Sequence, residues 1–258
     1  MTLHQWIKEA SDAGLDGFDL SVLFFRKHPD EQISACRKAA EAEGISPVLF
    51  NTYSDLAHPS ADVREKEVQQ LCDDIAAAGE VKAKYVRLVA GQGYPETGID
   101  EGVQWVVQGF LRAQDAARQA GVELVYENHS KPGIWQYADF SLSSEVYLRI
   151  ADALKGSAVR LLFDTANPIA AGEDPIELLE RIAEEVVCVH AADTRTSGAL
   201  NPVVIGTGLV PFSRLFSFLK QRGFSGWISL EEASGTGRDG IISGTAYVKE
   251  VWESCWKR

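Results

Sequence analysis

The sequence lacks several patterns that would assign it to a specific class at once. Its four cysteines form no CxxC pair, and it has neither an 18-residue apolar run nor a signal-peptide pattern. A glycine-rich dinucleotide fingerprint after the first apolar run is also absent. We therefore expect a reduced, cytoplasmic protein without structural disulfides or a membrane span.

Basic residues are scarce as well. The formal net charge is −12, and only five histidines occur in 258 residues. Nucleic acids and anionic membranes bind to basic patches, so we expect neither as a partner. A small-molecule substrate remains open, even an anionic one, because a bound metal can invert the local field. A homo-oligomer is also compatible with this composition.

What the sequence does have is a regular alternation of short apolar runs and amphipathic helical segments. With 45% hydrophobic residues and no linker-like stretch, we expect a single domain over residues 1–258. Runs that are apolar throughout indicate strands buried on both faces, as in a parallel sheet covered by helices. The runs lie at 17–21, 46–50, 85–90, 122–127, 159–164, 185–190 and 226–231. Seven such units predict an α/β fold of the (β/α)8 type, a TIM barrel.

This pattern is one strand short of eight. The chain opens directly on a helical segment, Thr2–Ala13, followed by Gly14-Leu15-Asp16-Gly17. We expect that the first strand is missing or irregular, or lies upstream of Met1. Something must then close the seam, because two unpaired strand edges promote aggregation.

Four side chains able to bind a metal stand at the ends of four successive late strands: Glu127, Asp164, His190 and Glu231. In a barrel these strand ends converge on one mouth. Three carboxylates and one imidazole suit a single divalent cation, with Mn²⁺ favoured over Mg²⁺, Co²⁺ or Zn²⁺. Each residue alone would also fit an ordinary polar strand end, and Asp164-Thr165 would fit a turn. Four in register favour the metal site.

Several stretches carry a family resemblance: Glu127-Asn128-His129, Phe163 to Pro168, Val189 to Thr194, Gly206 to Phe212 and Gly223 to Glu231. In this order they resemble the sugar phosphate isomerase/epimerase superfamily. Its xylose isomerase-like TIM barrel is shared with endonuclease IV (AP endonuclease family 2). The resemblance covers the chain from about residue 14 to residue 232.

The resemblance implies a mononuclear metal site at the same four positions, with Glu127 and Glu231 also serving as the acid/base pair. One glutamate would remove a proton from the carbon beside a carbonyl, and the other would return it. The metal would stabilise the developing enediolate. We therefore predict a metal-dependent isomerase or epimerase of a keto-sugar or related polyol derivative. Such a carbon acid needs both a positioned base and an electrophile.

Glu232 competes with Glu231 for the last position. Neighbouring residues of a strand point to opposite sides, so only one of the two can face the mouth. The preceding run does not decide between them. The family pattern favours the first glutamate after the apolar run, Glu231.

Four further residues are candidates for substrate binding. His129 could contact substrate or brace the metal shell, or be a loop histidine that bonds to backbone. Asn167 could bond to substrate or a metal ligand, or cap a helix. Arg87 could be directed at substrate or pair with a carboxylate such as Asp164. Arg195 could hold a substrate carboxylate or phosphate, or form a surface salt bridge.

Two glycine-rich loops follow the last two strands, Gly206-Thr207-Gly208 and Gly235-Thr236-Gly237-Arg238. Barrels often bind phosphate in this region through backbone N–H groups and a helix N-terminus. The glycines could instead serve tight turns alone.

Other functions compete with the isomerase prediction. A keto-polyol dehydratase of the inosose type would use the same metal and base. Relatives often carry lysine just before Asp193, where this chain has Ala191 and Ala192, which puts in doubt reactions that need a lysine acid. A non-catalytic metal- or sugar-binding relative is a further alternative, although Glu127 and Glu231 are intact. Endonuclease IV-like cleavage needs a histidine-rich three-metal cluster and a basic face, and five histidines with a net charge of −12 argue against both.

Overall fold

The computed structural model describes residues 2–26 and 29–255, and the chain forms two compact units. The first comprises Met1–Tyr126, Lys131–Ser141 and Val146–Arg160, and the second Glu127–Ser130, Leu142–Glu145 and Leu161–Arg258. Seven strands follow one another through the sheet in sequence order, β1 to β7. This is the order of a (β/α) barrel, whereas a doubly wound sheet reverses its order at a switch point.

The first unit carries the strands β1 (Gly17–Ser21), β2 (Ser46–Asn51) and β3 (Tyr85–Leu88). It also carries β4 (Glu123–Glu127), whose last residue, Glu127, belongs to the second unit. Neighbouring strands within it pair in parallel. All four residues of β3 are buried, as are the four central residues of β2. Burial on both faces explains why these strands are apolar throughout instead of alternating with polar residues.

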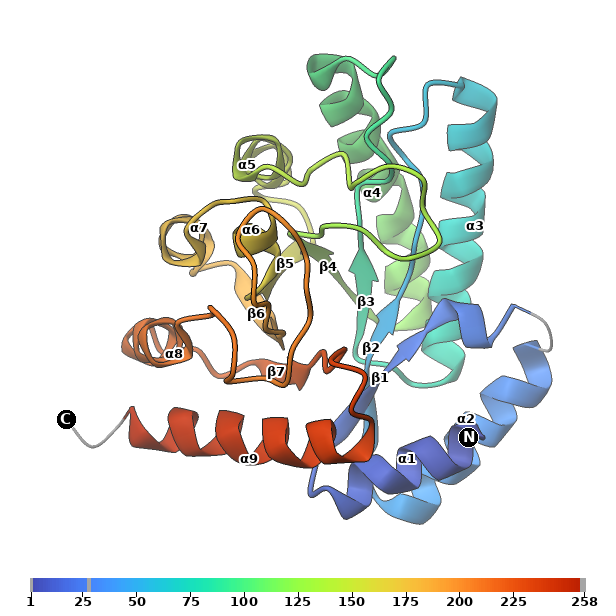
Figure 1. Cartoon of the computed structure of the whole chain (residues 1–258). Helices are drawn as coiled ribbons and strands as arrows, with labels where there is room; N and C mark the ends of the chain where they lie inside the picture. Colours follow the sequence, from blue (N-terminus) through green and yellow to red (C-terminus); the bar gives the residue numbers. More distant parts are fainter. Residues whose placement is uncertain (1, 27–28, 256–258) are drawn as a thin grey trace. The chain divides into compact units, whose positions relative to one another are not determined.

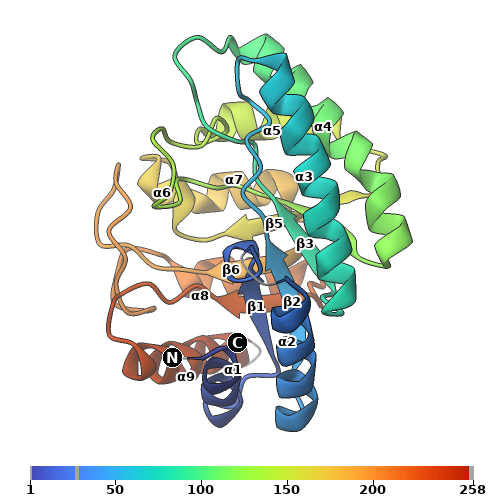
Figure 2. The same ribbon diagram turned by 90° about the vertical axis from the view of Figure 1, so that its right-hand side faces the viewer.

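The helices of this unit are α1 (Leu3–Asp12), the 3-10 turn η1 (Val22–Phe24), α2 (Pro29–Glu43), α3 (Ala61–Glu80), α4 (Ile99–Ala120) and most of α5 (Ser144–Ala153). Local sequence signals set their ends. Thr2 and Gln5 form a capping box at the start of α1. Gly121 ends α4 at φ 72°, a left-handed conformation that favours glycine. Helices α3 and α4 lie side by side (Figures 1 and 2).

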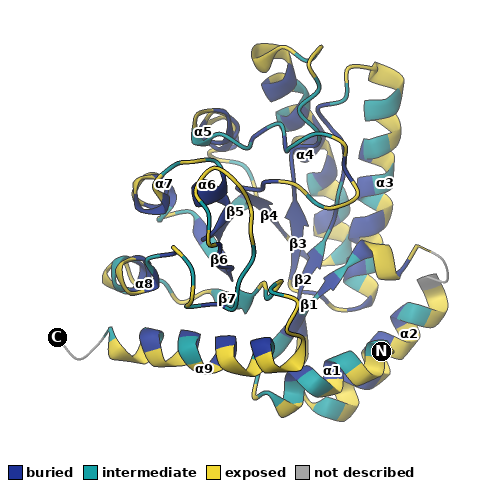
Figure 3. Cartoon of the chain, viewed as in Figure 1, coloured by how far each residue is buried: buried dark blue, intermediate teal, exposed yellow. Residues whose placement is uncertain are grey.

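The second unit carries most of β5 (Val159–Asp164), with β6 (Val186–Ala191), β7 (Trp227–Leu230) and the helices α6 (Asn167–Ala170), α7 (Pro175–Ile182), α8 (Phe212–Gln221) and α9 (Arg238–Ser254). Its strands also pair in parallel. Asp174 caps α7 through the N–H of Ile176, with Pro175 in the first turn. Figure 3 shows α9 with buried residues along one side and exposed residues along the other.

The seven observed strands coincide with the seven predicted apolar runs to within one or two residues at each end. The chain opens on α1, and β1 at Gly17 is the first strand in the described part of the chain, so the count of seven is confirmed there. Over the same residues, no helix combines the length and apolarity required to cross a bilayer. A single domain and a cytoplasmic location stay predictions.

One buried ion pair of the first unit leads to a prediction about pH. Asp74 of α3 is 4% exposed, accepts a hydrogen bond from Gln70 and lies 3.0 Å from Arg26 Nη2. Burial raises the pKa of Asp74 to about 6, against 3.8 for an ordinary aspartate, while the Arg26 charge opposes the shift. Between these two values the folded state therefore binds more protons than the unfolded state.

We expect this group to lower the free energy of unfolding by about 2–3 kcal/mol as pH rises from 4 to 7. Chemical unfolding of wild type and Asp74→Asn across this range measures it, because the substituted protein lacks the titration. The stability of wild type relative to Asp74→Asn should fall as pH rises and then level off. Asp62→Asn, exposed on the same helix and not among the charges that shift the pKa of Asp74, is the matched control. Parallel curves for wild type and Asp74→Asn would contradict the assignment.

Candidate metal centre

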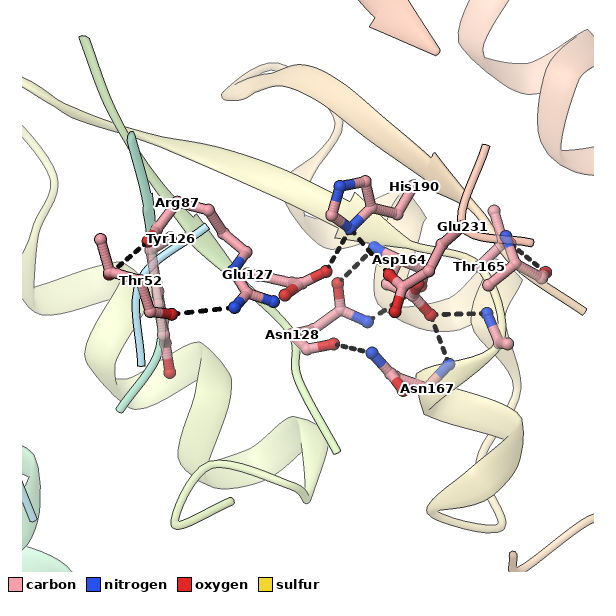
Figure 4. Close-up of polar contacts among 12 residues, drawn as sticks. Thr52, Arg87, Tyr126, Glu127, Asn128, Asp164, Thr165, Asn167, His190 and Glu231 are labelled. Carbon is pink, nitrogen blue, oxygen red and sulfur yellow. Dashed lines mark hydrogen bonds and ion pairs between the residues drawn. The ribbon is translucent and has the colours of Figure 1, made fainter. Parts of the chain in front are cut away.

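The four predicted ligands lie together in the second unit. Glu127 is the last residue of β4, Asp164 the last of β5, His190 lies within β6, and Glu231 directly follows β7. Each offers one ligand atom, and these atoms all lie within 4.8 Å of one another (Figure 4). Strand register contributes to this arrangement, because Asp164 pairs with His190.

The histidine is in contact with two of the glutamates. His190 Nδ1 lies 2.6 Å from Glu127 Oε1 and 3.2 Å from Glu231 Oε2. The side chains of His190 and Glu127 are 3% and 0% exposed, whereas that of Glu231 is 53% exposed. The site therefore has a fixed, buried inner part and one carboxylate that solvent or a ligand can reach.

The electrostatics of the cluster fit a bound cation. Burial raises the pKa of Asp164 well above its usual value, and the nearby charges of Glu231 and Glu127 raise it further. The His190 charge and a backbone hydrogen bond from Asn167 act in the opposite direction. Three carboxylates this close are costly to ionise together without a positive charge between them. A divalent cation held by oxygen and imidazole ligands would supply that charge.

Asn128 holds the end of β5 in place, a role that the sequence did not reveal. Its Oδ1 accepts the N–H of Asp164 at 2.8 Å, and its Nδ2 donates to the Asp164 carbonyl at 3.0 Å (Figure 4). The side-chain amide thus takes the place of a peptide group from a neighbouring strand. Because amide side chains carry a donor and an acceptor side by side, asparagine suits this position.

The carboxylate of Asp164 is oriented by its own turn. Its Oδ1 accepts the N–H groups of Ala166 at 2.8 Å and Asn167 at 2.7 Å. Thr165 then ties this turn to the segment after β6, because its Oγ1 donates to Ala192 O and accepts from Ala192 N. The turn interpretation of Asp164-Thr165 and the metal-ligand interpretation are therefore compatible in one structure.

The candidates for substrate binding differ in how far they are buried. His129 is buried, in the segment after β4. Asn167 is buried and donates from Nδ2 to Asn128 O at 3.0 Å. It is the first residue of α6, and Ala166 occupies the N-cap, so the helix-cap alternative for Asn167 is wrong. Arg195 is exposed, on the segment after β6. Contact of all three with substrate stays a prediction.

Arg87 belongs to the first unit. It is 3% exposed on β3 and donates from Nη2 to Thr52 O at 2.8 Å (Figure 4). Its guanidinium carbon lies 4.7 Å from the centre of the Tyr53 ring. A buried guanidinium over an aromatic ring is stabilised both by the ring face and by the carbonyl that it bonds. Its role toward substrate stays a prediction.

The structure shows which of Glu231 and Glu232 belongs to the candidate metal cluster. Glu231 lies in the cluster, whereas Glu232 Oε1 accepts the N–H of Ser234 at 3.1 Å. The Glu232 carboxyl lies against Gly240 in the first turn of α9, where an added Cβ would come within 2.6 Å of Glu232 Cδ. All four residues of β7 are half-buried. The strand therefore lacks the alternation of buried and exposed residues that would have shown which glutamate faces the mouth.

Comparison with known proteins gives the same picture of the fold. The family model described as a xylose isomerase-like TIM barrel matches residues 7–251. An inosose dehydratase of Lacticaseibacillus casei is 26% identical over 175 residues, which span 57% of this chain and 56% of that enzyme, about half its length. An inosose dehydratase of Clostridium botulinum (strain Alaska E43 / Type E3) is 24% identical over 96% of this chain and 89% of its own length.

Solved structures of other proteins support the same fold. The IOLI protein, solved with a bound zinc atom, has a TM-score of 0.84 at 18% identity, covering all of this chain and 95% of its own. A D-tagatose 3-epimerase-like protein has a TM-score of 0.81 at 18% identity, over 94% of this chain and 90% of its own. Together with the strand order, these similarities confirm the (β/α) barrel class that the sequence predicted.

Proposed function

Because the chain belongs to the xylose isomerase-like TIM barrel family, we propose that it is a metal-dependent isomerase or epimerase of a keto-sugar or related polyol derivative. The observation that carries the proposal is the cluster of Glu127, Asp164, His190 and Glu231, whose ligand atoms lie within 4.8 Å of one another. These four side chains would hold one divalent cation, with Mn²⁺ favoured. The relatives described as inosose dehydratases and sugar epimerases support a sugar-like substrate.

The cation, when bound, supplies a Lewis acid that stabilises negative charge developing on a substrate carbonyl oxygen. Proton transfer falls to the two glutamates. In this proposal the exposed Glu231 carboxylate takes the proton from the carbon beside the carbonyl and becomes a carboxylic acid. The buried Glu127, present as a protonated carboxylic acid, then gives its proton to the intermediate and becomes a carboxylate. For a substrate carbon of the opposite hand, the two glutamates exchange roles.

His190 and Asp164 act in this proposal as ligands only. His190 lies 2.6 Å from Glu127 and 3.2 Å from Glu231, so it helps to fix both acid/base groups. The Asp164 carboxylate is held by the N–H groups of Ala166 and Asn167. Rigid ligands leave the two glutamates as the groups whose protonation changes during the reaction. His129, Asn167, Arg195 and Arg87 are the proposed substrate contacts.

A second candidate is dehydration of a keto-polyol, which the inosose dehydratase relatives favour. It begins with the same proton removal beside a carbonyl. The next carbon then loses its hydroxyl group, which needs a proton donor. Ala191 and Ala192 occupy the positions where relatives often carry lysine, so that donor would have to be another group.

Solvent-deuterium exchange separates these functions. Protein loaded with Mn²⁺ is incubated in D₂O with a panel of ketoses and inososes, and products are followed by NMR and mass spectrometry. An isomerase or epimerase labels the carbon beside the carbonyl and forms an isomer, whereas a dehydratase forms a product lighter by one water. Stoichiometric binding of a sugar without exchange or elimination would overturn the catalytic proposal and support a binding protein.

A further inference from the structure

Backbone hydrogen bonds join the strand ends that carry three of the candidate metal ligands. Asp164 of β5 pairs with His190 of β6, and the N–H of Thr165 then donates to His190 O at 3.1 Å. At the end of β7, the N–H of Glu231 donates to Ala191 O at 3.1 Å. The sheet itself therefore sets the relative positions of these three backbones.

Glu127, the fourth candidate ligand, is tied to β5 by the side chain of the residue that follows it. Asn128 is 5% exposed, and its amide bonds both the N–H of Asp164, at 2.8 Å, and the carbonyl of Asp164, at 3.0 Å (Figure 4). An amide that donates and accepts in this way continues the ladder of hydrogen bonds between two strand ends. The position of Glu127 relative to Asp164 therefore depends at this point on one side chain.

Asn167 holds Asn128 in turn. Its Nδ2 donates to Asn128 O at 3.0 Å, and its own N–H donates to Asp164 Oδ1 at 2.7 Å (Figure 4). Asn128, Asp164 and Asn167 thus form a closed cycle of hydrogen bonds within the second unit. Each of the three is at most 8% exposed. Linked hydrogen bonds that are shielded from water strengthen one another, so the cycle holds its members rigidly.

The cycle bears on the role of Asn167. The sequence left open whether this side chain bonds to substrate or to a metal ligand. In the structure its N–H bonds the Asp164 carboxylate, and its amide acts on the same residue through Asn128. The bond to Asn128 uses one N–H of the amide, so the proposed contact with substrate is compatible with it.

We propose that Asn128 and Asn167 are positioning residues of the metal centre, which hold the Glu127 and Asp164 carboxylates at the separation that one divalent cation requires. Both act through the hydrogen bonds of the cycle, without contact to the cation. The proposal rests on the proposed function, because Glu127 and Asp164 are taken as ligands. Loss of a hydrogen bond that orients a metal ligand typically weakens metal binding by about 10–100-fold.

The test measures Mn²⁺ binding to wild type, Asn128→Ala, Asn167→Ala and the double variant. EPR of free Mn²⁺ gives the dissociation constant without any substrate, and thermal unfolding of the metal-free proteins is recorded in parallel. Binding is measured well below the lowest unfolding temperature, so that only folded proteins are compared. We expect each single variant to bind Mn²⁺ about tenfold more weakly than wild type. Asn201→Ala, at an exposed position of the same unit, is the control and should bind as wild type.

The double variant distinguishes one cycle from two independent effects. If both residues act through the same cycle, the loss of affinity in the double variant should be clearly smaller than the product of the two single losses. A loss equal to that product would contradict the cycle. Lower stability of the metal-free variants with unchanged Mn²⁺ affinity would show that the asparagines support the fold alone, and would overturn the proposal.

Asn167→Ala keeps the test readable if Asn128→Ala does not fold. Removal of the Asn128 side chain leaves both the N–H and the carbonyl of Asp164 without their partner. Asn167→Ala retains the backbone N–H that the Asp164 carboxylate accepts. Wild-type affinity in Asn167→Ala overturns the proposal, whichever way Asn128→Ala behaves. A wild type that binds no Mn²⁺ overturns the proposed function and this proposal together, whereas a wild type that binds it with the same affinity as the variants overturns this proposal alone.

Discussion

Replacement of Glu231 by glutamine is expected to lower the rate of solvent-deuterium exchange into a ketose substrate by about 10³-fold or more. Glutamine keeps the size of the side chain but cannot take up a proton at neutral pH. The Glu231 side chain is 53% exposed, so the change should leave the fold intact. The measurement is the NMR exchange rate at saturating Mn²⁺, with bound metal determined in the same samples.

Metal content matters because Glu231 is also a proposed ligand. Three of the proposed ligands remain in Glu231→Gln, and two of them, Asp164 and His190, lie on neighbouring paired strands. Loss of exchange in a sample that still holds metal would assign proton transfer to Glu231 itself. Glu180→Gln, remote in sequence on α7, is the control and should exchange at the wild-type rate. Near-normal exchange in Glu231→Gln would remove this residue from the acid/base pair.

Removal of the metal is expected to abolish exchange and to lower stability together. A ligand that binds only the folded state stabilises it by about 4 kcal/mol when present at 1,000 times its dissociation constant. In this protein the cation would also relieve repulsion among three carboxylates within one small cluster. Thermal unfolding and exchange, measured before and after chelation and again after Mn²⁺ is restored, follow both effects.

The pH dependence of metal binding follows from Asp164. Its pKa is raised well above the usual value in the metal-free protein, first by burial and then by Glu231 and Glu127. Below that pKa a proton competes with the metal, so the apparent affinity should rise with pH until Asp164 is ionised, and binding should release protons.

Asp164→Asn is the matched variant for metal removal, because asparagine keeps an oxygen that can accept the N–H groups of Ala166 and Asn167. It should fold, yet lose most of the stabilisation by Mn²⁺. Unchanged exchange and unchanged stability after complete removal of metal from wild type would exclude the metal-dependent reaction.

The positions of the strands and of the candidate ligands could be predicted from the sequence. Glu127 and Asp164 each end an apolar run that forms a strand. A run that is apolar throughout predicts a strand buried on both faces, even when its neighbours are unknown. Family resemblance then assigned a shared chemistry to four such strand ends. Local signals, such as the Thr2 capping box and Gly121, acted over a few residues and set helix ends in the same way.

Hydrogen bonds from side chains to the backbone of distant segments could not be predicted. Asn128 binds the backbone of Asp164, and Asp193 gathers the N–H groups of Gly206, Gly208 and Val210. Nothing in the local pattern distinguishes these side chains from ordinary loop asparagine and aspartate. Their partners become defined only when separate segments are brought together.

The sequence by itself determined the alternation of strands and helices and indicated which strand ends carry side chains able to bind a metal. The hydrophobic periodicity of a segment is a local property of the sequence, so it indicates a strand or a helix whatever packs against that segment. Only the tertiary structure decided between Glu231 and Glu232 as the residue in the cluster, because all of β7 is half-buried and burial does not alternate along it. It also decided that Gly206 and Gly208 donate to the internal carboxylate of Asp193, since the donors and the acceptor come from different segments.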